Sequence, residues 1–326
     1  MFKLVNVTFN LLAGWFDQNQ KINLYFAANM KIMKLQWLFV FIPLALASCN
    51  NSKTGNLLGG GAPFDSTQLD KMPLPDESKF VQVVKDVDSF WDFYHNIGSH
   101  RTLQIRVEFL FPMEVDTPKN PFVEYNVGGQ MVIKGVSDLK IIGVGNKPVK
   151  ITQPNSKREL LSFVDCNNIE IENVEADGGD VIYSFANCHN VFINKSIIHG
   201  AEKDGILAEG CTNMNFKKVQ ITDCQGMTFE LNKSSKMRFF DCNFNNNNQF
   251  DFIGSNYVIF NKTTISDYKA FHTEPLDTAL FNMNTTDSVF VKGCTIKDNF
   301  ASKLTTSPAN LILINNISEG NNWDKK

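Results

Sequence analysis

Three acidic side chains lie in successive units of a repeated pattern, where carboxylates could transfer protons or hold a cation. Glu230 and Asp251 occupy the same position of two successive units, and Asp204 follows Lys203 one unit earlier. Two stacked carboxylates repel each other unless a proton or a cation lies between them. A shared proton suits general acid catalysis, and Ca²⁺ takes oxygen ligands. We predict Asp204, Glu230 and Asp251 as catalytic candidates and Glu230 and Asp251 also as Ca²⁺ ligands, although the pattern requires no cofactor.

Other polar residues are predicted to lie beside these carboxylates and to bind substrate. They are Glu209, Asn232 and Asn282 at outward strand positions, Asp180 and Lys203 in preceding turns, and Lys269 and His272 in an inserted loop. An elongated polar strip beside a longer loop suits an extended polysaccharide, because binding residues often lie on loops over a rigid scaffold. Two plainer interpretations stay open. Outward positions of any soluble repeat are polar, and Asp204-Gly205 is a common turn pair.

A repeat of about 22 residues would position these side chains. Its marks are the apolar residues Leu139, Ile169, Val191, Met214, Met237, Val258, Val289 and Leu311, each followed two positions later by another apolar residue. Apolar columns also lie six and eight positions before the marks, and another lies seven after them, with Asn146 and Ser318 in its end units. Apolar residues spaced by two indicate strands. Three short strands in each of about eight units predict an all-β coil of stacked rungs.

A column of turn residues supports stacking of this kind. Asn168, Asn190 and Asn213 each stand just before a mark. Asn accepts the left-handed turn conformation and can bond to its neighbours above and below. Stacked rungs lie about 4.8 Å apart and bury the apolar face that one rung cannot bury alone. This column favours a parallel β-helix over a sandwich, and the Leu and Asn spacing of leucine-rich repeats is absent.

Units such as Asn168-Ile169-Glu170-Ile171-Glu172 and Asp204-Gly205-Ile206-Leu207 resemble rungs of right-handed parallel β-helix proteins, the pectate-lyase-like superfamily. The resemblance covers about residues 81–317. It implies a right-handed coil, and a function among polysaccharide lyases, glycoside hydrolases, epimerases and proteins of unassigned function, which the fold alone does not separate. Gly179-Asp180 and Lys203-Asp204 partly match polygalacturonase motifs. Gln225 stands where that family has His, and no Arg-Ile-Lys follows, which argues against inverting hydrolysis.

The N-terminal sequence predicts that the protein is located in the bacterial envelope. Residues 30–49 combine two lysines with an apolar run that is too short to span a bilayer comfortably. Leu46-Ala47-Ser48-Cys49 resembles a lipobox, which implies lipidation of Cys49 and a lipid anchor in the membrane. The alternative is an ordinary secretory signal with an incidental Cys. Asn50 is not Asp, which favours the outer membrane, while the periplasmic or surface side stays open.

The domain boundaries follow from this signal. Residues 1–29 lie upstream of the expected true start and are excluded from the fold. Residues 50–78 are predicted to form a flexible tether, and residues 79–326 a β-helix domain. Strand 81–84, helix 86–97 and strand 101–106 form a predicted N-terminal cap, which protects the first rung of a solenoid. At the other end, only residues 318–326 remain as cover.

The composition argues against a nucleic-acid partner and leaves a protein partner open. The chain has 31 basic and 34 acidic residues, so no nucleic-acid footprint appears. Besides Cys49, six Cys remain. Five of them fall in repeat columns, namely Cys166, Cys188, Cys211, Cys242 and Cys294. These columns predict buried free thiols, and no C-x-x-C pair suggests a metal site. Ile259, Phe290 and Ile312 form an outward apolar stripe near the C-terminal end. Either a protein partner or the tail 318–326 is expected to cover it.

Three functions follow as hypotheses. The first is an envelope-anchored lipoprotein that binds carbohydrate along the polar strip, without certain catalysis. The second is a polysaccharide lyase or glycoside hydrolase that uses Asp204, Glu230 and Asp251 with a nearby Lys. The third is a structural or adhesion protein that works through the apolar outer stripe.

Overall fold

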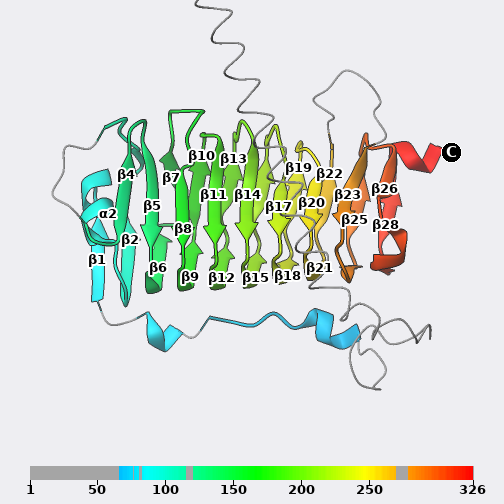
Figure 1. The fold of residues 1–326 in the computed structure, drawn as a ribbon, viewed down its shortest axis with the longest axis horizontal. Helices are drawn as coiled ribbons and strands as arrows, with labels where there is room; N and C mark the ends of the chain where they lie inside the picture. The colour runs from blue at the N-terminus through cyan, green and yellow to red at the C-terminus, as the bar shows by residue number, and fades with distance from the viewer. Residues whose placement is uncertain (1–65, 76, 81–82, 115–119, 269–277, 326) are drawn as a thin grey trace, which may run out of the picture. The chain divides into compact units, whose positions relative to one another are not determined.

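The computed structural model describes residues 66–75, 77–80, 83–114, 120–268 and 278–325. In this part of the chain, three sheets run side by side along a column, and each circuit of the chain adds one strand to each sheet (Figure 1). All neighbouring strands pair in parallel except β4 and β5, which are antiparallel. The all-β parallel coil predicted from the repeat is therefore confirmed.

The three sheets are named A, B and C. Sheet A contains β1 (Val83–Val87), β2 (Arg101–Ile105), β6 (Ser137–Gly143), β9 (Asn167–Glu172), β12 (His189–Asn194), β15 (Thr212–Lys217), β18 (Ser235–Phe240), β21 (Asn256–Asn261), β24 (Val289–Lys292) and β27 (Leu311–Ile314). Sheet B contains β3 (Phe109–Leu110), β7 (Val149–Thr152), β10 (Val174–Asp177), β13 (Ile197–His199), β16 (Gln220–Thr222), β19 (Asn243–Asn245), β22 (Thr264–Ser266), β25 (Thr295–Lys297) and β28 (Ile317–Glu319). Sheet C contains β4 (Val123–Asn126), β5 (Gln130–Lys134), β8 (Leu161–Val164), β11 (Val181–Ala186), β14 (Asp204–Glu209), β17 (Phe229–Asn232), β20 (Phe250–Ile253), β23 (Ala279–Asn284) and β26 (Lys303–Thr305).

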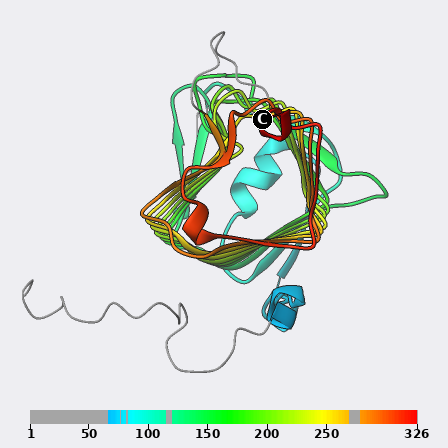
Figure 2. The same cartoon turned by 90° about the vertical axis from the view of Figure 1, so that its right-hand side faces the viewer.

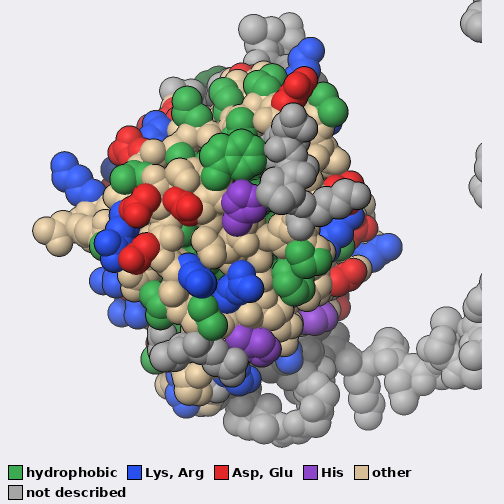
Figure 3. Space-filling model, turned by 90° about the vertical axis from the view of Figure 1, so that its left-hand side faces the viewer, with side chains coloured by type: hydrophobic (Ala, Val, Ile, Leu, Met, Phe, Trp, Pro, Cys, Tyr) green, Lys and Arg blue, Asp and Glu red, His purple; other side chains and the backbone are tan. Residues whose placement is uncertain are grey.

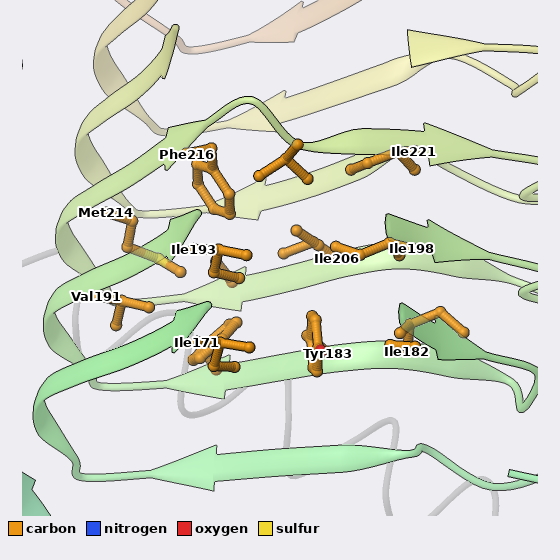
Figure 4. Packing of buried hydrophobic residues seen from close by; sticks show 14 of the residues in the cluster. Ile171, Ile182, Tyr183, Val191, Ile193, Ile198, Ile206, Met214, Phe216 and Ile221 are labelled. Atoms are coloured by element: carbon orange, nitrogen blue, oxygen red, sulfur yellow. The ribbon is translucent and has the colours of Figure 1, made fainter. Parts of the chain in front are cut away.

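The core fills the interior of the coil with stacked columns of like side chains. Both columns predicted before the marks are buried throughout. Figure 4 shows Val191 stacked with Met214 and Ile193 stacked with Phe216 from neighbouring rungs. Farther along, the ring of Phe239 lies 4.6 Å from that of Phe229 and 4.7 Å from that of Phe260, measured between centroids. Close aromatic packing of this kind adds stability beyond the buried area.

The predicted Asn turn column is also confirmed. Asn168, Asn190 and Asn213 have φ of 56°, 56° and 58°, the left-handed conformation, and Asp138 begins the column at 57°. The amide of Asn213 donates to Asn190 Oδ1 at 2.6 Å, and that of Asn168 donates to Asp138 Oδ1 at 2.6 Å. Side-chain hydrogen bonds between rungs thus hold each turn in register with the next.

One predicted core position was wrong. Asn146 was aligned with the apolar column seven residues after the marks, but it is exposed. Ile151 of β7 fills that place, in register with Ala176 of β10. The turn between β6 and β7 is longer than in later rungs, so the fixed spacing fails there.

A strand–helix–strand cap closes the N-terminal end, as predicted. α2 (Phe90–Asn96) follows β1 and lies across the end of the coil (Figure 2). Its N-cap is Ser89, whose Oγ accepts from Asp92 N at 3.1 Å. Phe93 and Tyr94 are buried, whereas Trp91 is 40% exposed. Figure 3 views this end, where apolar and charged side chains mix over a closed surface.

Residues 66–75 and 77–80, here called the strap, cross the outer face of sheet A. Figure 1 shows the strap running beneath sheet A, from η1 (Ser66–Asp70) near β21 to η2 (Glu77–Lys79) near β1. Leu69 is buried against Ile259 and Phe290, and Asn261 Nδ2 donates to Leu69 O at 2.8 Å. The strap also accepts a hydrogen bond at Phe80 O from Thr102 Oγ1, at 2.9 Å.

The strap corrects two expectations. The stretch 50–78 was predicted to be a flexible tether; among its described residues Leu69 is buried against the β-helix, while most of the others are exposed. The apolar stripe was expected to meet a protein partner or the C-terminal tail. Ile259 and Phe290 are instead 0% and 2% exposed beneath the strap, while Ile312 is half-buried beside them. The strap therefore covers two of the three residues of the stripe, and the adhesion hypothesis stays a prediction with less apolar surface behind it.

The C-terminal end is closed lightly, by η3 (Pro308–Asn310) and η4 (Asn322–Lys325). Trp323 of η4 packs against the core, but Leu313 of the last rung is 50% exposed. No helix in the described part of the chain is long and apolar enough to cross a membrane.

The six Cys in the described residues are free and buried, as the repeat columns predicted for five of them. Stacked thiols take the place of small apolar side chains at the corners between sheets, and Cys211 Sγ accepts from Cys188 N at 3.4 Å. Burial raises the pKa of Cys224 to about 12, so this thiol stays protonated and unreactive.

Candidate functional site

The outer face of sheet C carries the predicted polar strip. Its rungs are in register: Glu230 pairs with Asp251, and Asp251 pairs with Asn282. A parallel row brings Glu209 beside Asn232. The stacking predicted for Glu230 and Asp251 is thus confirmed. We define the strip as Glu209, Glu230, Asn232, Asp251, Asn282 and Asn284.

The strip presents both carboxylates and amides to solvent. Glu209 and Asn284 are exposed, while Glu230, Asn232, Asp251 and Asn282 are half-buried. Asn282 Nδ2 donates to Asp251 Oδ1 at 3.1 Å, which orients both side chains and leaves the amide oxygen available as an acceptor. Groups of this kind can both donate to and accept from hydroxyl groups.

The turn that enters β14 places Lys203 and Asp204 at one end of the strip. Lys203 N donates to Asp180 O at 2.8 Å, and Asp204 N donates to the same oxygen at 3.2 Å. Asp204 Oδ1 accepts from Met227 N at 2.8 Å, which ties this turn to the next rung. A Cβ at Gly226 would lie 2.5 Å from Lys203 O, so the close approach of the two turns requires glycine there.

Asp204 differs from its prediction. It is 0% exposed, so a bound polymer could not touch it directly, and the turn interpretation of Asp204-Gly205 describes it better. Its Oδ2 is buried and accepts no hydrogen bond. The Nζ of Lys203 lies 3.4 Å from that oxygen and stays near the surface. Asp204 therefore acts on the strip through its charge and through Lys203.

Electrostatic effects couple these groups. Burial, followed by the charge of Asp204, raises the pKa of Glu230 above its ordinary value, and the charges of Asp251 and Glu209 raise it further. Burial raises the pKa of Asp251 as well, against the hydrogen bond from Asn282. The charge of Asp204 is the main cause that raises the pKa of Lys203. The ammonium group of Lys203 is thus stabilised, while the carboxylates of Glu230 and Asp251 are destabilised in their charged form.

The other predicted residues have mixed outcomes. Asp180 is half-buried and supplies backbone contacts, and its charge acts on Lys203. Lys269 and His272 lie outside the described residues. Within the described ranges, no group of three or more His, Cys, Asp or Glu side chains is arranged to hold a metal ion. Glu230 and Asp251 alone supply fewer oxygens than the six to eight that Ca²⁺ takes.

A second charged cluster, on the outer face of sheet B, was not predicted as a unit. His199 Nε2 lies 3.1 Å from Glu175 Oε1, and its Nδ1 lies 3.2 Å from Asp177 Oδ1. Lys150 Nζ lies 2.8 Å from Asp177 Oδ2. Three rungs contribute to it, β7, β10 and β13. The sequence signal for this cluster was the alternation along β10, which points Glu175 and Asp177 outward. The long turn between β6 and β7 shifts the spacing of the repeat, so the sequence did not show that Lys150 pairs with Glu175.

Comparisons with known proteins agree on this architecture. The family model described as "Right handed beta helix region" matches residues 146–265. The structure is similar to pectate lyase Pel9A (TM-score 0.53, 7% identity, 73% of this chain and 77% of that one). It is also similar to pectate lyase Bsp165PelA from Bacillus sp. N165, solved with trigalacturonate (TM-score 0.50, 14% identity, 74% and 83%). A search of curated proteins found no match.

The chain is therefore a right-handed parallel β-helix protein of pectate-lyase-like architecture. Identities this low show the fold and leave the activity to be argued from the site.

Proposed function

We propose that this protein binds a polysaccharide along the strip on sheet C. The carrying observation is the register of the strip, where hydrogen-bonding side chains from four successive rungs share one face of a rigid sheet. The row of Glu230, Asp251 and Asn282 offers polar groups at regular steps, which fits a ligand that repeats too; in the second row, Ile253 separates Asn232 from Asn284. The structural neighbours include a pectate lyase solved with trigalacturonate, which supports a saccharide ligand for this architecture.

A binding assay with matched variants tests this proposal. The full chain would be titrated calorimetrically with neutral, acidic and amine-bearing polysaccharides. Replacing Asn232 and Asn282 by Ala should weaken binding about 30-fold, because each lost hydrogen-bonding group is worth about 1 kcal/mol. Asn243→Ala, an exposed amide on sheet B, is the control and should bind as the parent does. Absence of binding to every polymer, or equal losses in variant and control, would contradict the proposal.

Catalysis by the same strip is the second candidate, because Glu230 and Asp251 both have a raised pKa. A carboxyl group that holds its proton longer can act as a general acid. Lys203, whose charge acts on Glu230, is a further group for proton transfer. Products would appear as new reducing ends, with double-bond absorbance in addition for a lyase. Activity that Glu230→Gln abolishes while binding survives would establish an enzyme. Unchanged polymer in the presence of tight binding would refute catalysis.

We also propose that Cys49 carries a lipid that anchors the protein in the bacterial envelope, on the outer membrane. The lipobox-like sequence Leu46-Ala47-Ser48-Cys49 after an apolar run supports this proposal. Mass spectrometry of the mature protein from cells should find an acylated N-terminal Cys49, and Cys49→Ala should release the protein from the membrane fraction. An unmodified mature Cys49 would refute the anchor.

A further inference from the structure

A cavity of about 210 Å³ lies between the strap and the outer face of sheet A. Met72, Pro73, Leu74 and Pro75 of the strap, here called the roof, cover it, and β9, β12 and β15 supply its other walls. A cavity of about 150 Å³ in a protein core can hold a benzene molecule, so this one has room for a body of about eight or nine non-hydrogen atoms. None of its lining residues belongs to the strip on sheet C.

The roof and the floor of this cavity are apolar. Phe192 of β12 forms the floor and is 5% exposed, and Met72 and Pro75 of the roof are half-buried. Proline fixes its own φ and holds the preceding residue in an extended conformation, so the two prolines keep the roof from collapsing onto the sheet. Because proline also lacks an N–H group, these surfaces suit the apolar part of a ligand.

The two carboxylates in the cavity wall, Glu170 and Glu172, already have cationic partners within the protein. Lys140 Nζ lies 3.3 Å from Glu170 Oε1 and 3.4 Å from Glu172 Oε2. Lys195 Nζ lies 2.8 Å from Glu172 Oε1. Burial raises the pKa of Glu172, but the hydrogen bonds and charges of Lys195 and Lys140 outweigh it, and the pKa is lowered. A cationic ligand would therefore have to compete with these lysines.

Lys217 adds a third ammonium group to the cavity. Its half-buried side chain lines the wall from β15, and no carboxylate of the described residues forms an ion pair with it. Three ammonium groups, those of Lys140, Lys195 and Lys217, thus meet two carboxylates, and the cavity has one positive charge in excess. A partly buried charge is costly without a partner, and a carboxylate on a ligand would supply one through a charge-assisted hydrogen bond.

We propose that this cavity binds a small organic anion, a carboxylate with an apolar body. The body lies between Phe192 and the roof, and the carboxylate pairs with Lys217. Because the roof is part of the strap, a bound ligand also holds the strap closed against sheet A, as any ligand stabilises the state that binds it. The site is separate from the strip on sheet C, so it stands whether or not the strip binds a polysaccharide.

The experiment compares three compounds of nearly the same shape, benzoate, benzamide and benzamidine, which are negative, neutral and positive at neutral pH. The full chain is titrated calorimetrically with each. Benzoate should bind about 10-fold more tightly than benzamide, at the lower end for a hydrogen bond to a charged group, and benzamidine should bind most weakly. Acetate, which has the charge without the body, should also bind more weakly than benzoate. Lys217→Met keeps a long side chain without its charge, and should abolish the preference for benzoate while benzamide binds as before.

The matched control is Lys218→Met, which removes an exposed lysine beside Lys217 that does not line the cavity, and it should bind benzoate as the parent does. Hydrogen exchange locates the ligand: benzoate at ten times its Kd should slow exchange in residues 66–75 about 10-fold. Bound benzoate that leaves this exchange unchanged would overturn the inference. Equal affinity for the three compounds, equal losses in Lys217→Met and Lys218→Met, or no binding at all would overturn it too.

Discussion

Leu69→Ala is expected to loosen the strap from sheet A without unfolding the coil. Leu69 is completely buried against Ile259 and Phe290. The substitution removes about three carbon groups from an apolar contact, which costs about 2.4 kcal/mol at about 0.8 kcal/mol for each group. One hydrogen bond from Asn261 to the strap backbone remains and is worth about 1 kcal/mol. The ion pair between Lys292 and Asp70 also remains, and the half-exposed Asp70 carboxylate lets solvent weaken it.

The free energy of strap opening should therefore fall by about 2.4 kcal/mol, which raises the open population about 50-fold. Hydrogen exchange measures this quantity directly, because backbone amides of residues 66–75 exchange through local opening. Their exchange rates should rise by about the same factor, while peptides from the inner strands of sheets B and C keep their rates. Binding of a hydrophobic dye should also increase as Ile259 and Phe290 reach solvent.

Leu74→Ala is the matched control, since Leu74 lies in the same strap but is 74% exposed. It should leave exchange within a factor of about 2, as most exposed substitutions change stability by less than 0.5 kcal/mol. A Leu69→Ala strap that exchanges like the parent would refute the reasoning. So would a Leu74→Ala strap that opens as readily, because the contact of Leu69 would then not be what holds the segment.

Three further predictions concern the site, the thiols and the core. Asp251→Asn should raise the urea midpoint at neutral pH: its raised native pKa destabilises the fold when ionised, and the gain should vanish below about pH 3.9, where both states are protonated. An equal gain at both pH values would contradict this. Cys188, whose pKa is raised to about 12, and the other five buried thiols should react with a thiol reagent only after denaturation; a thiol titrating in the native protein would refute it. Phe229→Ala should cost about 3–5 kcal/mol of unfolding free energy, whereas exposed Phe300→Ala should cost under about 0.5 kcal/mol; similar losses would show that the aromatic column does not carry the core.

The coil could be predicted from the sequence because two local patterns recur in each unit: apolar residues spaced by two, and a turn residue before each mark. Apolar residues spaced by two set the inward face of each strand, and one register then places every later strand, so Glu230 and Asp251 could be paired from spacing alone. Asn168 and Asn190 mark turns through their own tolerance of the left-handed conformation. Each rule depends on neighbouring residues and needs no information from distant parts of the chain.

The strap and the burial of Asp204 could not be predicted in this way. Leu69 meets β21 across about 190 residues of sequence, and nothing in the irregular stretch before β1 carries a period. Asp204 begins a strand, where inward and outward alternation has not yet started, so its side chain follows the turn and bonds to Met227. The cluster around His199 needed the register of β7, which the long preceding turn had shifted.

Two of the three outer faces, those of sheets A and C, differ in what they expose. Sheet A carries an apolar stripe that would attract unrelated proteins if it were open, and the strap closes it with Leu69. Sheet C holds Glu230 and Asp251 one above the other on a rigid face, and the repulsion between their charges lowers the stability of the fold. Functional sites commonly carry such a loss of stability. Because rungs of a solenoid contact only their neighbours, opening the strap on one sheet should leave polymer affinity on the other unchanged. Leu69→Ala in the polysaccharide titration tests this independence, and a loss of affinity there would show that the two faces are coupled.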